Sequence, residues 1–273
     1  IVEHGLQAET KQVAQQTADK LRSMGFDLVQ VVSVKVAESG STEAAARVAR
    51  YAALDQALLD HKARYILLAH TLNDQAETVL LGLARGSGAR SLSGMSAVNG
   101  KYLRPFLALE RSTTEQACAD QGIEFWNDPH NIDPSFSRVR VRRNVLPVLE
   151  AELGPGIAQA LARTADQARE DEQALAEAAA RVFDSLAIKG GTTIKIAVED
   201  LAWHPIAIRH RVVMRAVSEM QAPAISRAHI LAIDELVDHW HGQKPLTIPG
   251  VRVERVDGQI VFKTTKTLKP GAC

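Results

Sequence analysis

The stretch from His70 to Thr78 holds the residues best suited to chemistry. It follows a short apolar run and carries two carboxylates, Asp74 and Glu77, three positions apart. Residues at this spacing lie on one face of a helix, and two carboxylates near a helix N-terminus can hold a cation or a substrate ammonium group. Alternatively, Asp74 only caps the helix and favours its dipole, while His70 packs in the core. The stretch alone does not decide between these interpretations.

A glycine-containing segment follows the same predicted helix, at Arg85, Gly86, Ser87 and Gly88. Glycine lets the backbone turn and approach a ligand closely, and flanking arginines suit phosphate. The segment also serves as a helix end followed by a turn, which needs no ligand. It is therefore a candidate phosphate contact with an open alternative.

Arginines gather at two further places. Arg47 and Arg50 lie one helical turn apart, near Glu43 and Tyr51. Four more guanidinium groups fall within six residues, a density that suits a phosphate backbone, at Arg138, Arg140, Arg142 and Arg143. Both groups could equally be solvated charged faces. A looser basic group in the last third of the chain is only suggestive: His204, Arg209, His210, Arg211, Arg215 and Arg227.

Composition bounds the class of protein. The 273 residues are 46% hydrophobic and 23% charged, as in globular proteins with a substantial core. Lys plus Arg and Asp plus Glu both number 32, so any polyanion must be bound by a local patch. Cys118 and Cys273 cannot build a disulfide framework or a four-thiolate zinc site, and we assign no metal ligand. No apolar run is long enough to span a membrane and no signal peptide is present, so we expect a cytoplasmic protein.

The first half of the chain alternates helices and strands. We expect helices over 6–24, 40–60, 74–84 and 112–122, strands over 28–36 and 64–70, and a loop over 126–134. Ser112 and Glu115 have the spacing of a capping box, and strand 64–70 is apolar enough to be covered on both faces. This order predicts a parallel α/β sheet, whose ligands bind beyond the carboxyl ends of the strands.

The second half has a different character. The Leu153 to Gly156 segment breaks the chain, and we place a domain boundary at residue 154. A long helix over 157–188 follows, then a strand over 192–198, helices over 206–220 and 226–239, and a hairpin turned by Asp257 and Gly258. This pattern predicts a small α+β domain.

Seven segments, in order and spacing, resemble the tRNA(Ile)-lysidine synthetase family of the PP-loop ATP pyrophosphatase superfamily. They are Glu3 to Leu6, Glu43 to Tyr51, His70 to Thr78, Arg85 to Gly88, Leu103 to Leu107, Asp128 to Asp133 and Arg138 to Pro147. Two features depart from the family pattern. Asn73 replaces the first acidic residue of its Asp-Asp pair, and its Ser-Gly-Gly-x-Asp-Ser loop occurs nowhere in the sequence. We expect that loop to precede Ile1, and expect the sequence without it to bind ATP poorly.

The resemblance implies a fold and a division of the chain. Residues 1–154 would form a Rossmann-like α/β domain with a parallel sheet of the PP-loop type, its N-terminal strand and loop missing. Residues 155–273 would form the long linker helix and a smaller helical α+β domain that binds tRNA or substrate.

The resemblance also implies an activity. ATP would adenylate C2 of the wobble cytidine of the CAU-anticodon isoleucine tRNA, and free L-lysine would displace AMP to give lysidine. ATP and Mg²⁺ would be the cofactors, with no membrane partner, and no protein partner can be inferred. Alternatives are another PP-loop tRNA-modifying enzyme, disfavoured because Cys118 has no second cysteine nearby, and a non-catalytic RNA-binding remnant.

Carried over residue by residue, the resemblance implies three groups of site residues. Arg50, Asp74 and Glu77 would be catalytic, with Asp74 and Glu77 binding lysine's amino group. ATP would be bound by His4, His70, Arg85, Gly86, Ser87 and Gly88. The tRNA would be met by Arg104, Arg138, Arg140, Arg142 and Arg143.

Overall fold

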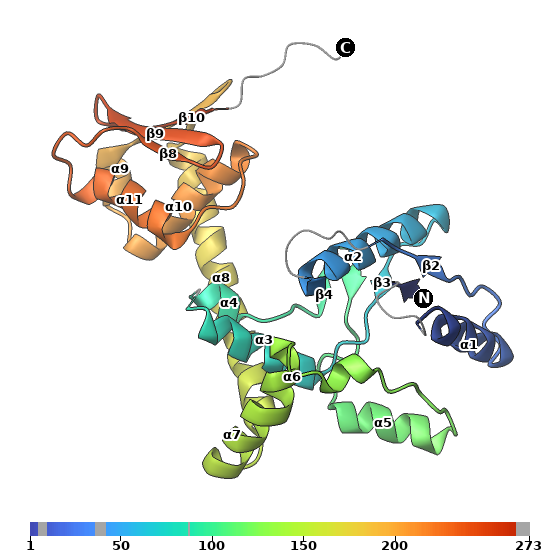
Figure 1. The fold of residues 1–273 in the computed structure, drawn as a ribbon. Helices are drawn as coiled ribbons and strands as arrows, with labels where there is room; N and C mark the ends of the chain where they lie inside the picture. Colours follow the sequence, from blue (N-terminus) through green and yellow to red (C-terminus); the bar gives the residue numbers. More distant parts are fainter. Residues whose placement is uncertain (5–9, 36–41, 87, 266–273) are drawn as a thin grey trace. The chain divides into compact units, whose positions relative to one another are not determined.

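A computed structural model describes residues 1–4, 10–35, 42–86 and 88–265 of the chain, without the side chains of 42–44. The chain divides into two compact units (Figure 1). Unit 1 comprises residues 1–81 and 95–162, and unit 2 comprises residues 82–94 and 163–273. Ser87 and Cys273 lie outside the described residues.

Unit 1 contains short strands in two sheets. β1 (Val2–Glu3) pairs in parallel with β2 (Val32–Ser33). In the other sheet β5 (Tyr102–Leu103) lies between β3 (Ile66–Leu67), to which it is parallel, and the antiparallel β4 (Val98–Asn99). The predicted parallel α/β organisation is therefore present.

The predicted strands of unit 1 are too long. Within residues 28–35, the part of the 28–36 stretch that the structure describes, only Val32–Ser33 is a strand, paired with the two residues of β1. Only Ile66–Leu67 of 64–70 is a strand, and Leu67 is 68% exposed, so the expectation that this strand is covered on both faces is wrong for the described residues.

Four helices of unit 1 correspond to predicted ones: α1 (Thr10–Ser23), α2 (Thr42–Asp60), α3 (Leu72–Ala84) and α5 (Arg111–Asp120). Two others, α6 (Ser137–Arg140) and α7 (Leu146–Leu153), were not predicted from the sequence. A 3-10 turn, η1 (Pro129–Ile132), lies in the predicted loop, and a π-helical turn, η2 (Val141–Val145), joins α6 to α7. Leu72 and Ala76 of α3 pack against Val141, Leu146 and Ala158, so this core fixes the Arg-rich segment beside α3 (Figure 1).

Unit 2 is built on a five-stranded antiparallel sheet in the order β6-β7-β10-β9-β8. Its strands are β6 (Ile188–Gly190), β7 (Thr193–Ala197), β8 (Leu246–Ile248), β9 (Val251–Val256) and β10 (Gln259–Thr264). Its helices are α4 (Ala89–Leu92), α9 (Val198–Ala202), α10 (Ile206–Glu219) and α11 (Arg227–Asp238), together with most of α8 (Ile157–Leu186). Alternate residues of β7, β9 and β10 join helix residues such as Phe183 in one core.

Two glycine-dependent features of unit 2 have clear causes. Asp257 and Gly258 both have positive φ, as the predicted two-residue hairpin turn requires. A Cβ on Gly82 would lie 2.6 Å from the carbonyl oxygen of Ser91, so only glycine lets the end of α3 approach α4 this closely. Among the described residues, no helix is both long and apolar enough to cross a membrane.

Candidate active site

The first turn of α3 presents both predicted carboxylates on one side. Asp74 Oδ2 accepts hydrogen bonds from the backbone N–H and the hydroxyl of Thr71, each at 2.8 Å. Asp74 therefore does cap its helix, as the alternative interpretation held, but only through Oδ2. Its Oδ1 faces two guanidinium groups, at 3.3 Å from Arg111 and 3.6 Å from Arg142.

Glu77 is the most buried charged group of the site, with a fully inaccessible side chain. Arg142 Nε donates to its Oε1 at 2.6 Å and Arg142 Nη2 donates to its Oε2 at 3.3 Å. Arg138 Nη1 lies 3.6 Å from Oε2. Burial of the Arg142 guanidinium lowers its pKa, but the hydrogen bond to Glu77 outweighs this effect, so the pKa of Arg142 is raised. The paired carboxylates thus anchor arginines in this structure.

Arg111 was not predicted from the sequence, and it completes the cluster. Its backbone N–H donates to Asn73 Oδ1 at 2.8 Å, and its guanidinium Nη2 donates to Asp74 Oδ1 at 3.3 Å. Asn73 thus supplies an acceptor at the start of α5, a role that needs an oxygen and no charge. The predicted capping box at Ser112 and Glu115 is wrong, because α5 begins at Arg111 without a side-chain cap from its own N-cap residue.

The predicted tRNA-binding arginines separate into inward and outward groups. Arg138 and Arg142 point to Glu77, and Arg104 is buried, with its Nη1 donating to the carbonyl oxygen of Ser96 at 2.8 Å. Arg140 is exposed and donates only to the carbonyl oxygens of Pro134 and Ser135, and Arg143 is also exposed. In the described part of the chain, Arg140 and Arg143 have no carboxylate partner.

Two histidines follow strand ends of unit 1. His4 comes after β1 and His70 after β3, and each has a buried Nδ1 without a hydrogen-bond partner among the described residues. Burial lowers the pKa of both rings; Arg50 adds to this at His4, and Arg104, Arg47 and Arg138 do so at His70. Both imidazoles are therefore neutral at pH 7, with one nitrogen free to donate to or accept from a ligand.

Arg50 belongs to the His4 end of the site. Its Nε lies 3.3 Å from His4 Nε2, which links α2 to the end of β1. One turn earlier on α2, Arg47 lies over the Tyr51 ring at 4.8 Å. Tyr51 in turn meets Tyr102 of β5 edge to face, with ring centroids 5.0 Å apart. The arginines of α2 thus have specific partners in unit 1.

The predicted phosphate segment belongs to unit 2. Arg85, Gly86 and Gly88 are exposed, and both glycines have positive φ, so the backbone turns there as predicted. Ser87 lies outside the described residues.

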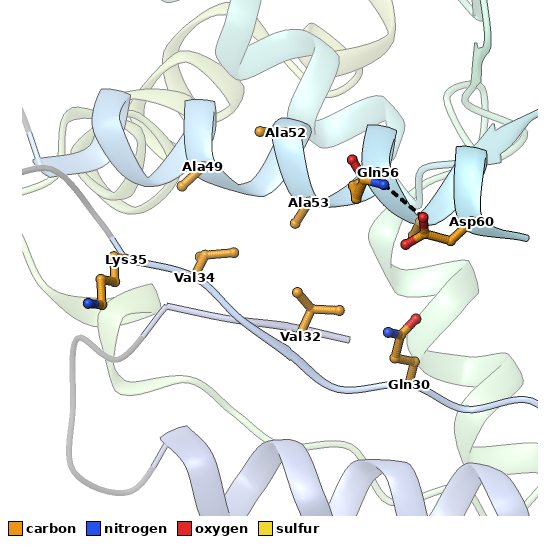
Figure 2. A pocket seen from close by; sticks show the side chains of 10 residues that line it. Gln30, Val32, Val34, Lys35, Ala49, Ala52, Ala53, Gln56 and Asp60 are labelled. Carbon is orange, nitrogen blue, oxygen red and sulfur yellow. Dashed lines mark hydrogen bonds between the residues drawn. The ribbon is translucent and has the colours of Figure 1, made fainter.

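A cavity of about 380 Å³ lies between α2 and the segment carrying β2 (Figure 2). Ala49, Ala52 and Ala53 of α2 face Val32 and Val34 across it (Figure 2). None of the predicted site residues lines this cavity. Its lining also includes the polar and charged residues Gln30, Lys35, Gln56 and Asp60.

Metal ligation has little support in the described residues. No group of three or more His, Cys, Asp or Glu side chains there is placed to hold a metal ion. The α3 site presents two carboxylates and three guanidinium groups, which suit recognition of charged substrates.

Comparison with known proteins defines the class first. Residues 1–149 match the family model of the PP-loop domain, an ATP-binding domain, and residues 197–261 match that of the TilS substrate binding domain. The chain is 51% identical to the tRNA(Ile)-lysidine synthase of Leifsonia xyli subsp. xyli, over 96% of this chain and 79% of that protein. It is 49% identical to that of Thermobifida fusca, over 95% and 80% of the two chains.

The chain belongs to the tRNA(Ile)-lysidine synthase family, whose members are ligases with a PP-loop domain. The solved structure of a U34-tRNA thiolase from Methanococcus maripaludis is also similar, at 14% identity and a TM-score of 0.48 over 61% of this chain and 60% of that one. That likeness is too distant to bear on fold or function.

Proposed function

We propose that this protein ligates lysine onto C2 of the wobble cytidine of the isoleucine tRNA with a CAU anticodon, giving lysidine. In the first step the C2 carbonyl oxygen attacks the α-phosphorus of ATP and pyrophosphate leaves. In the second step the side-chain amine of lysine attacks C2, loses a proton and displaces AMP with that oxygen. Family membership supports this reaction, and the observation that carries it in the structure is the pair Asp74 and Glu77 on α3, held among arginines.

The lysine subsite would be formed by Asp74 and Glu77. Asp74 Oδ1 is the accessible acceptor, because its guanidinium contacts are long, at 3.3 and 3.6 Å, and the side chain is 17% exposed. Glu77 is inaccessible, so it acts by fixing Arg142 and Arg138 around the subsite. The Asp74 carboxylate can therefore accept hydrogen bonds from an ammonium group at Oδ1.

The nucleotide would meet the neutral imidazoles of His4 and His70. Their unpartnered buried Nδ1 atoms fit a ligand that offers both donors and acceptors, as adenine and ribose do. Arg50, held by His4, would contact the adenylated centre and offset its negative charge. Arg85, Gly86, Ser87 and Gly88 stay predicted phosphate contacts.

Mg²⁺ would accompany ATP and spread the negative charge of the leaving pyrophosphate. Such a nucleotide-bound ion needs only one or two protein carboxylates in addition to the phosphates. We propose no particular ligand for it.

The tRNA contact would rest first on Arg140 and Arg143. Both are exposed and lack a carboxylate partner among the described residues, so each can neutralise a phosphate without breaking an ion pair. Arg104, Arg138 and Arg142 are engaged within unit 1, and any contact they make with tRNA would come from their remaining donors.

A transfer assay tests the proposed reaction. The full-length protein is incubated with ATP, Mg²⁺, labelled lysine and unmodified isoleucine tRNA carrying a CAU anticodon. We expect label in the tRNA and release of pyrophosphate and AMP, with no label when the anticodon cytidine is replaced by uridine. Bound tRNA that stays unlabelled would instead support the RNA-binding remnant.

Glu77→Ala tests the site assignment. Because the change leaves Arg142 and Arg138 without their carboxylate, lysine-dependent turnover should be abolished while tRNA affinity stays the same. Filter binding of tRNA and lysine transfer are measured side by side. Glu115→Ala, on the exposed face of α5, is the matched control. An equal loss of tRNA affinity in Glu77→Ala would refute the lysine-specific role.

A further inference from the structure

The α3 cluster carries more positive than negative charge. Two carboxylates, Asp74 and Glu77, face three guanidinium groups, those of Arg111, Arg138 and Arg142. Because one positive charge is left over, the cluster can attract an anion, while its carboxylates can still attract a cation. The proposed substrate lysine brings both, since its head group holds an ammonium and a carboxylate on one carbon.

The Arg111 guanidinium has several donors that no described residue uses. Of its five N–H groups, one hydrogen bonds to a described residue, at the 3.3 Å contact with Asp74 Oδ1. Its Nε is buried and has no partner there. The side chain is 34% exposed, so other donors of the guanidinium remain accessible. An arginine with this many unused donors is suited to a bidentate oxyanion.

The backbone of Arg111 is fixed although its side chain is not fully engaged. Asn73 of α3 accepts the Arg111 N–H at 2.8 Å, and Thr114 Oγ1 donates to the Arg111 carbonyl oxygen at 2.7 Å. Asn73 and Asp74 are neighbours in the sequence, so the acceptor that positions Arg111 and the carboxylate that it meets move together. The arrangement therefore holds a guanidinium beside a carboxylate with little freedom left in the backbone.

We propose that Arg111 binds the α-carboxylate of the substrate lysine, while Asp74 Oδ1 accepts from its α-ammonium. The inference rests on the proposed function and deepens it. A carboxylate and a guanidinium side by side are complementary to the two charges of an amino-acid head group. Holding lysine by its head group leaves the side-chain amine free to reach C2 of the cytidine, as the second step requires.

The other two arginines are less available for this task. Arg142 donates two hydrogen bonds to Glu77, at 2.6 and 3.3 Å, and lies 3.6 Å from Asp74 Oδ1 as well. Arg138 donates to Thr78 Oγ1 at 3.4 Å and lies 3.6 Å from Glu77. Recruiting either one would weaken the contacts of a carboxylate that is fully buried, which is costly.

Ligand binding measured for two compounds tests the proposal. L-Lysine and L-lysinamide differ in the charge that Arg111 would recognise. In equilibrium dialysis of the full-length protein with bound tRNA, the affinity for lysine should exceed the affinity for lysinamide by about tenfold or more. In Arg111→Gln lysine affinity should fall about tenfold or more, lysinamide affinity should stay within about threefold, and the preference should disappear.

A second variant and a control keep the outcome readable. Arg111→Lys retains the charge without the planar fork, so it should keep part of the preference even if Arg111→Gln folds poorly. Arg181→Gln removes an exposed arginine of α8 and should leave both affinities unchanged. Thermal melting of each variant reports on folding.

Two results would overturn the inference and leave the proposed function standing. One is an equal loss of affinity for both ligands in Arg111→Gln, which would mean that Arg111 only supports Asp74. The other is a loss of pyrophosphate affinity with an unchanged lysine preference, which would assign Arg111 to phosphate. If the unchanged protein binds neither lysine nor lysinamide, the proposed function itself fails.

Discussion

Two arginine and carboxylate clusters, one in each unit, show opposite charge arrangements. In unit 2, Arg209 of α10 donates twice to Asp234 of α11, both at 2.9 Å, and also to Asp238. The side chains of Arg209 and Asp234 are 8% and 9% exposed. In unit 1, three half-exposed guanidinium groups surround Asp74 and the inaccessible Glu77.

The difference separates a structural ion pair from a recognition site. The Arg209 guanidinium is satisfied by carboxylates on one neighbouring helix, and the hydrogen bond to Asp234 raises its pKa. Arg211 and Arg215 of the same helix also meet carboxylates, those of Glu172 and Glu219. Three arginines of the basic group noted in this part of the sequence are therefore engaged within unit 2. The α3 cluster instead keeps spare donors at Arg111.

Arg209→Ala should give the largest effect on stability. It leaves Asp234 buried without its main counterion, which costs about 3–5 kcal/mol of unfolding free energy. Urea denaturation followed by circular dichroism measures the loss. Arg252→Ala, which removes an exposed ion pair with a 3.8 Å contact, should cost about 1 kcal/mol or less.

Replacing both partners sharpens the same comparison. Arg209→Met combined with Asp234→Leu removes both buried charges and should recover most of the lost stability. If Arg209→Ala costs no more than Arg252→Ala, the buried pair does not hold α10 to α11 and the contrast between the two clusters is wrong.

The next effect concerns arginines that have no carboxylate partner among the described residues. Arg140→Gln combined with Arg143→Gln should weaken tRNA binding and reduce the slope of log affinity against log salt by about 1 to 2. Stability should change by less than about 0.5 kcal/mol, because the side chains are exposed. Binding at several salt concentrations measures the slope.

The control for this experiment is another pair of exposed arginines. Arg163→Gln combined with Arg181→Gln on α8 removes the same charge and should leave the salt slope unchanged. If both double variants lower the slope alike, the Arg-rich segment is a general charged face, the alternative that the sequence left open.

Local rules predicted the parts of the site that local geometry determines. Asp74 and Glu77 share a face because a helix brings residues three apart together, and both do reach Arg142. The Asp257-Gly258 turn likewise predicted its hairpin. By contrast, β6 and β8 were missed because strands of three residues are too short to show a period.

Tertiary pairing explains the remaining errors. Arg111 meets Asp74 across 37 positions, a contact that no spacing rule contains. The start of α5 was misplaced because its acceptor comes from Asn73 of another helix. Strand 28–36 was overestimated because β-branched composition indicates a preference, whereas pairing depends on the length of the partner strand.

The smallest expected effect is a pH dependence confined to unit 1. Burial lowers the pKa of His70 in the folded protein, so below the ordinary value of 6.5 the unfolded chain binds more protons than the folded one. The free energy of unfolding should therefore stay constant above about pH 6.5 and fall as the pH drops below that value. The slope against pH should correspond to the uptake of less than one proton by His70 on unfolding. Burial also lowers the pKa of His4, which acts in the same direction.

His70→Gln isolates this contribution, because glutamine can replace the hydrogen bonding of a neutral imidazole but does not titrate. Urea denaturation between pH 5 and 7.5 should show a flatter pH dependence for this variant, whereas His61→Gln, an exposed histidine of the same unit, should follow the unchanged protein. ATP binding over the same range should weaken at low pH, since a protonated His70 loses the nitrogen that can accept a hydrogen bond from the ligand. ATP binding whose pH dependence is unaltered by His70→Gln would remove His70 from the nucleotide site and leave His4, Arg50 and Arg85 as its predicted contacts.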